Sequence, residues 1–328
     1  MREAIAGLPD QLRWAAEVDT PTVEGASEIL VCGMGGSAIS GDYLAALTAE
    51  TGKRVTTHRG YGLPRWSPHV RPLILAVSYS GDTEETLSAV DRAAEWGLPV
   101  GVVASGGELV RRAREAGWPT IVVPAGHQPR AALGYLLGGA ARLAACAGVL
   151  PGIIDELVEA ADVVADLLDS GAAPGLARDL AGALDGRIPV VYGAVGPTAP
   201  VAMRWKTQIN ENGKWPAWWS LLPEADHNEV VGWAARPDLS RRVGLVALRD
   251  RLETPETARR FEATMEVTAA QVDWVGEVWS QGESTLARMM SLTVVGDLVS
   301  VELAESAGVD PTPVEVIERL KRLLKEGD

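Results

Sequence analysis

The chain has 328 residues, enough for two ordinary domains that each bury a core. Hydrophobic residues make up 47% and charged residues 23%, as in ordinary soluble globular proteins. The net charge of −14, with no basic block to offset it, argues against a surface that binds nucleic acid or an anionic membrane. The two cysteines support neither a disulfide framework nor a zinc site, and no signal-peptide pattern is present, so we expect a cytoplasmic protein.

Strands and helices alternate through the first half of the chain. Strands are predicted at residues 29–32, 55–58, 73–77, 100–104 and 120–124, and helices at 37–49, 83–95 and 109–116. Short runs of Val, Ile and Leu between helical patterns predict a parallel sheet with helices on both faces. Binding sites in such a doubly wound sheet lie at the carboxyl ends of the strands.

The apolar stretch 131–150 is long enough to cross a bilayer, but Arg142 lies in its middle. We therefore predict a buried helix between domains. The second half repeats the α/β pattern less regularly, with helices at 153–168, 176–184 and from about residue 200, and strands at 188–192, 243–248 and 272–278. The fold class is thus predicted as two doubly wound αβα sandwich domains, 1–150 and 151–328, with a C-terminal helix in the second.

A hydroxyl-rich turn follows the predicted strand 73–77 directly. Ser78, Ser80 and Thr83 would surround the free N–H groups of the helix that starts there. Backbone amides and the helix dipole favour a dianionic phosphate at such a turn, with no metal required. The second half has Leu248-Arg249-Asp250 at the corresponding position, so one phosphate site per chain is expected.

A glycine loop follows the first strand and contains Gly35, Gly36 and Ser37. It also fits the dinucleotide fingerprint G-x-G-x-x-A, and Arg59 at the end of the second strand could meet the extra phosphate of NADP. Alternatively, its glycines serve only tight turns. The remaining interpretation is that this loop and residues 78–83 converge on one small phosphoester.

Residues 208–229 hold candidate catalytic groups. Glu211 closes a helix between two asparagines and could remove a proton next to a carbonyl, while His227 could shuttle a proton. An exposed helix-end glutamate and a structural histidine are the alternatives. Tryptophans around this stretch favour an apolar wall or subunit interface over a sugar-stacking platform.

Two basic residues complete the candidate set. Arg130 should lie at the carboxyl edge of the sheet beside the phosphate and should have an anionic partner. Lys321 lies in an amphipathic terminal helix, where the pattern alone predicts a solvated lysine. The chain contains no H-E-x-x-H, C-x-x-C, G-x-S-x-G or Walker A motif, which disfavours zinc, serine-hydrolase and nucleotide triphosphate chemistry.

Five motifs in this order resemble the sugar isomerase (SIS) superfamily, and more closely its bifunctional phosphoglucose/phosphomannose isomerases. They are GMGGSA, SYSGDTEET, the PR of GHQPRAALGY, INEN followed by LPEADHNE, and VEVIERLK. The resemblance implies two SIS domains, a metal-free and cofactor-free isomerisation of glucose 6-phosphate to fructose 6-phosphate through an enediolate, and a homodimer. The alternatives are a SIS protein that only senses a phosphosugar and an NADP-binding oxidoreductase.

The resemblance also implies residue roles. Loop hydroxyls hold the substrate phosphate, namely those of Ser37, Ser78, Ser80 and Thr83. Glu211 moves a proton between C2 and C1, and Arg130 stabilises the enediolate. His227, contributed by the neighbouring subunit, and Lys321 assist ring opening. Family members that also accept mannose 6-phosphate carry a threonine near the terminal lysine, and Thr312 is the nearby threonine here.

Overall fold

Parallel strands form a five-stranded sheet in the first half of the chain, in the order β2-β1-β3-β4-β5. The structure is a computed structural model that describes residues 1–326. The strands are β1 (Glu28–Cys32), β2 (Arg54–His58), β3 (Leu73–Val77), β4 (Val100–Ala104) and β5 (Thr120–Val122). The strand order reverses direction at β1 and β3, so a crevice opens between their carboxyl ends, where such sheets bind ligands.

Helices cover both faces of this sheet, which explains why its strands are apolar throughout. They are α1 (Arg2–Ala6), α2 (Leu8–Glu17), α3 (Gly35–Leu47), α4 (Ser67–Val70), α5 (Glu84–Glu95), α6 (Gly107–Ala116), η1 (Pro129–Ala131) and α7 (Leu133–Cys146). On β3, Leu75 and Val77 join the core that includes α3 and α7, whereas Ile74 and Ala76 join the core under α5 and α6. The predicted two-faced parallel sheet is confirmed.

A four-stranded parallel sheet forms the second half, in the order β7-β6-β8-β9. Its strands are β6 (Ile188–Ala194), β7 (Trp218–Leu222), β8 (Val243–Arg249) and β9 (Trp274–Trp279). Its helices are α8 (Ile153–Asp169), α9 (Ala172–Leu184), α10 (Thr198–Glu211), η2 (Glu224–His227), α11 (Glu229–Ala235), α12 (Pro237–Ser240), α13 (Pro255–Ala269), α14 (Thr285–Ser306) and α15 (Glu315–Glu326). Strand β7 is missing from the sequence prediction, because its aromatic residues lie on an edge strand that is partly exposed.

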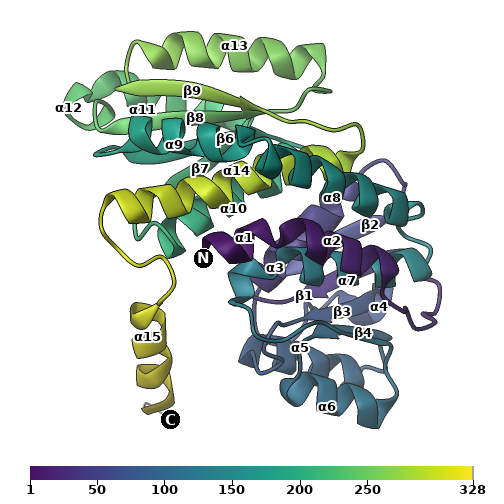
Figure 1. The fold of residues 1–328 in the computed structure, drawn as a ribbon. Helices are drawn as coiled ribbons and strands as arrows, with labels where there is room; N and C mark the ends of the chain where they lie inside the picture. Colours follow the sequence, from purple (N-terminus) through teal and green to yellow (C-terminus); the bar gives the residue numbers. More distant parts are fainter. Residues whose placement is uncertain (327–328) are drawn as a thin grey trace.

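Buried helices join the two sheets (Figure 1). Helix α14 packs against α8, α9 and α10, and α8 also packs against α2 of the first half. A buried ion pair connects Arg204 of α10 to Asp297 of α14 at 2.7 Å. Within the stretch 131–150, residues 133–146 form α7, whose Arg142 donates hydrogen bonds to the carbonyls of Ala16 and Val18. Among the described residues no helix has the length and apolar character needed to span a membrane. The domain boundary near residues 148–153 stays a prediction.

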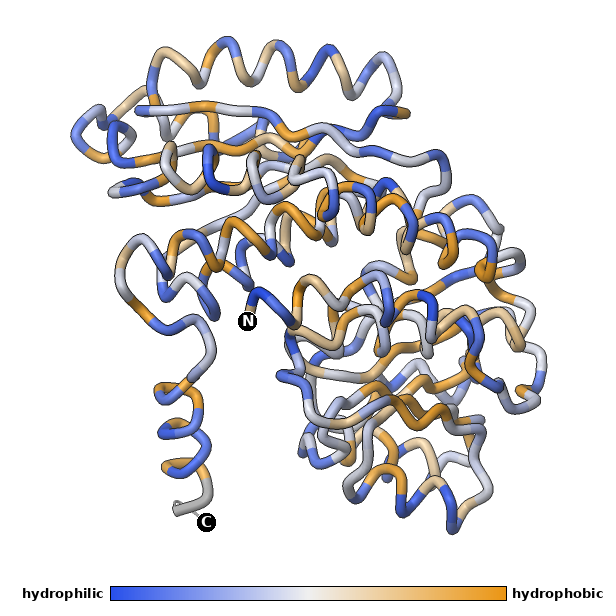
Figure 2. Tube along the Cα trace, viewed as in Figure 1, coloured by the Kyte–Doolittle hydropathy of each residue, from blue (hydrophilic) through white to orange (hydrophobic). Residues whose placement is uncertain are grey.

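Helix α15 projects away from the second sheet toward the first half, at the lower left of Figure 1. It alternates apolar and polar residues along its length, as Figure 2 shows. The exposed apolar side chains of α15 are those of Val316, Ile317, Leu320, Leu323 and Leu324. The predicted amphipathic terminal helix therefore exists and leaves its apolar residues largely uncovered by the described chain.

Candidate active site

The glycine loop between β1 and α3 is tightly enclosed. A Cβ at Gly33 would lie 2.7 Å from the carbonyl oxygen of Val77, and one at Gly36 would lie 3.2 Å from that of Pro129. Gly35 has a φ of +51°, a conformation that glycine adopts without strain. These glycines let the start of α3 approach both the end of β3 and the segment that carries Arg130. Because α3 begins at Gly35 rather than at the predicted residue 37, Ser37 lies within its first turn.

The hydroxyl-rich turn meets this loop at the predicted edge of the sheet. The Ser37 hydroxyl oxygen accepts a hydrogen bond from the backbone N–H of Tyr79 at 3.2 Å. Ser78 accepts from the N–H of Gly81 at 3.1 Å, and its hydroxyl lies 2.9 Å from that of Thr83. Two strand ends thus bring serine and threonine hydroxyls and helix N-termini together, which is the chemistry that binds phosphate.

Ser80 and Thr83 line a cavity of about 320 Å³ together with Lys321 of α15. Tyr61, Leu324 and three carboxylates complete its lining, the carboxylates being those of Asp82, Glu84 and Glu85. Lys321 is the one cation among these lining residues, so it supplies the local positive charge that an anion needs in an acidic chain. Lys321 is exposed, as its helical pattern predicts, and α15 also brings it to the cavity that Ser80 and Thr83 line.

Arg130 lies in η1, after β5, and is only 4% exposed. Its Nε donates to Oδ1 of Asn212 at 2.6 Å, and its Nη2 donates to the carbonyl oxygens of Pro311 at 3.0 Å and Thr312 at 2.6 Å. Its Nη1 lies 3.9 Å from Oε2 of Glu211. Burial lowers the pKa of Arg130, and the negative charge of Glu211 opposes that effect. Arg130 therefore joins the first sheet, the end of α10 and the segment that leads into α15.

Glu211 is the last residue of α10, as predicted, and its side chain is 30% exposed. Asn210 beside it donates to the carbonyl of Trp215 at 2.8 Å and so does not bind the carboxylate. Lys214 donates to the carbonyl of Pro311 at 3.3 Å, and burial lowers its pKa. Glu211 also lines an apolar cavity of about 630 Å³ with Trp215 and residues 313–317. Lys214 lines this cavity too and donates to the backbone carbonyl of Glu211. The carboxylate thus borders open space beside two cations, Arg130 and Lys214, where a substrate can reach it as a general base requires.

His227 lies apart from these groups. It ends the short helix η2 after β7 and is exposed. It lines neither the cavity at Lys321 nor the cavity at Glu211. The structure therefore brings Glu211 and Arg130 together, and Lys321 to the hydroxyl-rich turn, but does not bring His227 of the same chain to either cavity.

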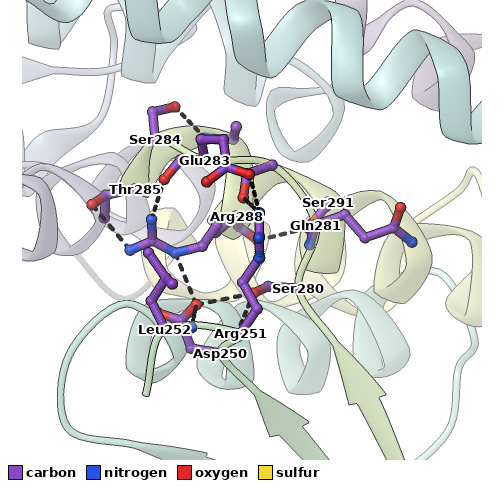
Figure 3. Close-up of polar contacts among 12 residues, drawn as sticks. Asp250, Arg251, Leu252, Ser280, Gln281, Glu283, Ser284, Thr285, Arg288 and Ser291 are labelled. Atoms are coloured by element: carbon purple, nitrogen blue, oxygen red, sulfur yellow. Dashed lines mark hydrogen bonds and ion pairs between the residues drawn. The ribbon is translucent and has the colours of Figure 1, made fainter. Parts of the chain in front are cut away.

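The corresponding edge of the second sheet holds an internal carboxylate instead of a phosphate cradle (Figure 3). Asp250 follows β8 as Ser78 follows β3, and its Oδ1 accepts from Ser280 at 2.9 Å and from Nε of Arg288 at 2.8 Å. It also accepts from the backbone N–H of Leu252 at 3.3 Å. A phosphate would meet the negative charge of Asp250 there, so this edge is unsuited to bind one.

Two alternative interpretations of the sequence find no support in the geometry. Arg59, considered for an NADP phosphate, forms an ion pair with Asp42. The tryptophans around residues 205–233 do not form a stacking platform together. Trp205 is fully buried and donates to the carbonyl of Leu292 at 2.9 Å, whereas Trp218 is 56% exposed on an edge strand.

Asn212 is the site residue that sequence reasoning missed. It is completely buried, and its Oδ1 accepts a hydrogen bond from Nε of Arg130 at 2.6 Å. The bond from Arg130 to the carbonyl of Thr312 has the same length. The position of Asn212 directly after the candidate base was visible in the sequence. Only the fold, however, places it against an arginine 82 residues away.

The chain is similar to known proteins both in sequence and in fold. Residues 174–324 match the family model described as bacterial phospho-glucose isomerase C-terminal SIS domain. The bifunctional phosphoglucose/phosphomannose isomerase of Caldicellulosiruptor bescii is 35% identical, over 99% of this chain and 99% of that protein. The one from Aquifex aeolicus is 36% identical, over 99% of this chain and 98% of that protein. In fold, the chain matches the C-terminal domain of glucosamine-fructose-6-phosphate aminotransferase from Francisella tularensis with a TM-score of 0.70, at 12% identity and over 94% and 97% of the two chains.

Proposed function

This chain belongs to the family of bifunctional phosphoglucose/phosphomannose isomerases, and from that premise we propose that it interconverts glucose 6-phosphate and mannose 6-phosphate with fructose 6-phosphate. The observation that carries the proposal is the pairing of Glu211 with Arg130 at 3.9 Å, on the side of the first sheet where the phosphate loops meet. An aldose–ketose isomerisation requires a base and a cation beside the same two reacting carbons, C1 and C2.

The phosphate end of the sugar is bound first in the proposed mechanism. Ser37, Ser78, Ser80 and Thr83 donate to the phosphate oxygens, and the N-termini of α3 and α5 add their dipoles. Binding energy from this remote group then orients the reacting carbons at Glu211. Lys321 lines the same cavity as Ser80 and Thr83, so it would also meet the sugar ring near its phosphate.

The proton transfer starts from the open-chain aldose. Glu211 removes the proton from C2, and the electron pair of that bond forms the C1–C2 double bond of an enediolate. The guanidinium of Arg130 stabilises the negative oxygen, as preorganised donors do at other oxyanions. Glu211 then returns the proton to C1, while the proton of the C2 hydroxyl moves to the oxygen on C1. Because C2 is oxidised as C1 is reduced, the reaction needs no external oxidant.

Ring opening requires an acid and a base at the ring oxygen and the C1 hydroxyl. We assign these roles to Lys321 and to His227 of a second copy of the chain. His227 is exposed and lines neither cavity of its own chain, which supports its contribution across a dimer interface. The uncovered apolar side chains of α15 support such an interface as well, since exposed apolar patches mark contact surfaces.

The same proposal includes the choice of sugar and the compartment. Thr312, whose carbonyl Arg130 holds at 2.6 Å, would lie near C2 and allow both epimers to react. Sugar phosphates are charged and do not cross membranes unaided, so we place the reaction in the cytoplasm.

Incubation of the purified protein with each aldose phosphate tests the proposal. We expect fructose 6-phosphate from both substrates, with no loss of rate when a chelator is added. Binding of the sugar phosphates with no ketose formed would instead favour a phosphosugar sensor.

Mixing two inactive variants tests the assignment of His227 to the partner. In a two-fold dimer, a chain with Glu211→Gln and a chain with His227→Gln together form one intact site. Random mixing should therefore restore about one quarter of the wild-type activity. A mixture that stays inactive after verified subunit exchange would show that His227 acts with Glu211 of its own chain.

A further inference from the structure

Within residues 1–326, strong hydrogen bonds hold the Arg130 guanidinium at Nε and Nη2 and leave one edge free. Its Nε is held by Asn212 at 2.6 Å, and its Nη2 by the carbonyls of Pro311 and Thr312. The remaining Nη1 makes only a long contact of 3.4 Å with Gln128 and faces Glu211 at 3.9 Å. The Nη1 edge therefore faces Glu211, and the hydrogen bonds at Nε and Nη2 fix the direction of that edge.

The orientation of the Asn212 amide is itself determined by a second hydrogen bond. Its Nδ2 donates to the hydroxyl of Ser300 at 3.0 Å, and that hydroxyl donates to the carbonyl of Asp297 at 2.6 Å. Both Asn212 and Ser300 are completely buried. Rotating the amide by half a turn would set its NH₂ group against the N–H of Arg130 and leave buried donors unpaired, at a cost of about 1–3 kcal/mol each. The oxygen therefore stays on Arg130.

The neutrality of Asn212 distinguishes Arg130 from the neighbouring Arg204. Arg204 makes two hydrogen bonds to the carboxylate of Asp297, at 2.7 and 3.0 Å, and supports Arg130 only by donating to its backbone carbonyl at 2.9 Å. Its charge is neutralised by a carboxylate. Arg130, by contrast, is held by an amide and two carbonyls, so its positive charge remains available to a developing anion.

We propose that Asn212, supported by Ser300, is a positioning residue that aims Arg130 at the enediolate without neutralising it. This inference rests on the proposed isomerisation and adds a residue to it. A carboxylate at position 212 would hold Arg130 equally well but compete with the enediolate for its charge. An alanine there would release the guanidinium, and a shift of about 1 Å in such a group can cost about 10²-fold in rate.

Steady-state kinetics on full-length variants test the proposal. Asn212→Ala should lower kcat about 10²-fold, and Asn212→Asp about tenfold through charge alone, with KM for fructose 6-phosphate within about threefold of wild type in both. Ser300→Ala keeps the direct contact and should lose less than Asn212→Ala. A five-carbon aldonic acid 5-phosphate has a carboxylate that resembles the enediolate. Its affinity for each variant should fall in parallel with the kcat/KM of that variant.

Tyr43→Phe is the matched control, because it removes another buried hydrogen bond to α14, from Tyr43 to Thr293 at 2.7 Å. It should lower the melting temperature and leave kcat unchanged. A kcat for Asn212→Ala within about threefold of wild type, or a loss explained by its folded fraction alone, would overturn the proposal. If Asn212→Ala does not fold, a wild-type kcat in Asn212→Asp would overturn it equally. A wild-type protein that converts none of the sugars would instead refute the proposed function.

Discussion

Replacing Gly81 by alanine tests whether the turn at residues 78–83 holds the substrate phosphate. Gly81 has a φ of +79°, and a Cβ there would lie 1.9 Å from the carbonyl oxygen of Gly106. Real Cβ atoms essentially never come closer than 3.0 Å, so the two backbone segments must separate by at least 1.1 Å (3.0 − 1.9). The left-handed conformation adds a cost of about 1–2 kcal/mol for a residue with a Cβ. The turn must therefore shift by a distance that disrupts hydrogen bonding to phosphate.

Calorimetric titration with inorganic phosphate and with fructose 6-phosphate measures the effect. We expect both affinities to fall at least tenfold in Gly81→Ala, a loss of about 1.4 kcal/mol or more. Gly97→Ala is the control, because Gly97 has a φ of +60° at the end of α5 and nothing within 4 Å of the added Cβ. It should lose stability but no affinity. Unchanged phosphate binding in Gly81→Ala would refute the assignment of this turn to the phosphate.

Three further outcomes are expected. Asp250→Ala should lower the free energy of unfolding in urea by about 3–5 kcal/mol, because the buried Arg288 loses its carboxylate. Its affinity for phosphosugars should not change, and weaker binding would show that the second sheet contributes to the site. Lys321→Met should lower kcat for fructose 6-phosphate formation about 10²-fold, as loss of a general acid–base group does, and a kcat within threefold of wild type would remove its role. Iodoacetamide at about pH 8 should modify the exposed Cys146 but not Cys32, since burial raises the pKa of the Cys32 thiol to about 12; mass spectrometry of the native protein would reveal a second label if this is wrong.

The sequence predicted the first sheet closely and the second less well, for a physical reason. Strands buried on both faces consist of uninterrupted Val, Ile and Leu, so Leu73–Val77 and Val100–Ala104 were predicted with their observed bounds. Strand β7 (Trp218–Leu222) lies at a sheet edge, where burial no longer imposes that pattern. No element was predicted for α2, although its amphipathic helix contributes Leu8 and Leu12 to the core.

The sequence likewise predicted some parts of the site and not others. The hydroxyl-rich turn at residues 78–83 was predictable because its residues are adjacent in the chain and directly follow a strand, whereas its role in phosphate binding stays a prediction. Glu211 and Arg130 could be linked only through the family resemblance, since the fold brings them together across 81 residues (211 − 130). The helical pattern predicted the exposure of Lys321 but not its position beside Ser80 and Thr83, because nothing in that pattern tells where the helix lies. Asn212 gave no signal other than its position beside Glu211.

The most direct test of the proposed mechanism is hydrogen exchange at the reacting carbons. In deuterated water, the wild-type protein should incorporate solvent deuterium at C1 of fructose 6-phosphate and at C2 of the aldose phosphates, because the proton held by Glu211 exchanges before it returns. Glu211→Gln should bind fructose 6-phosphate with nearly wild-type affinity and incorporate none. Deuterium at either carbon in that variant, at a rate within tenfold of wild type, would contradict the assignment of Glu211 as the base.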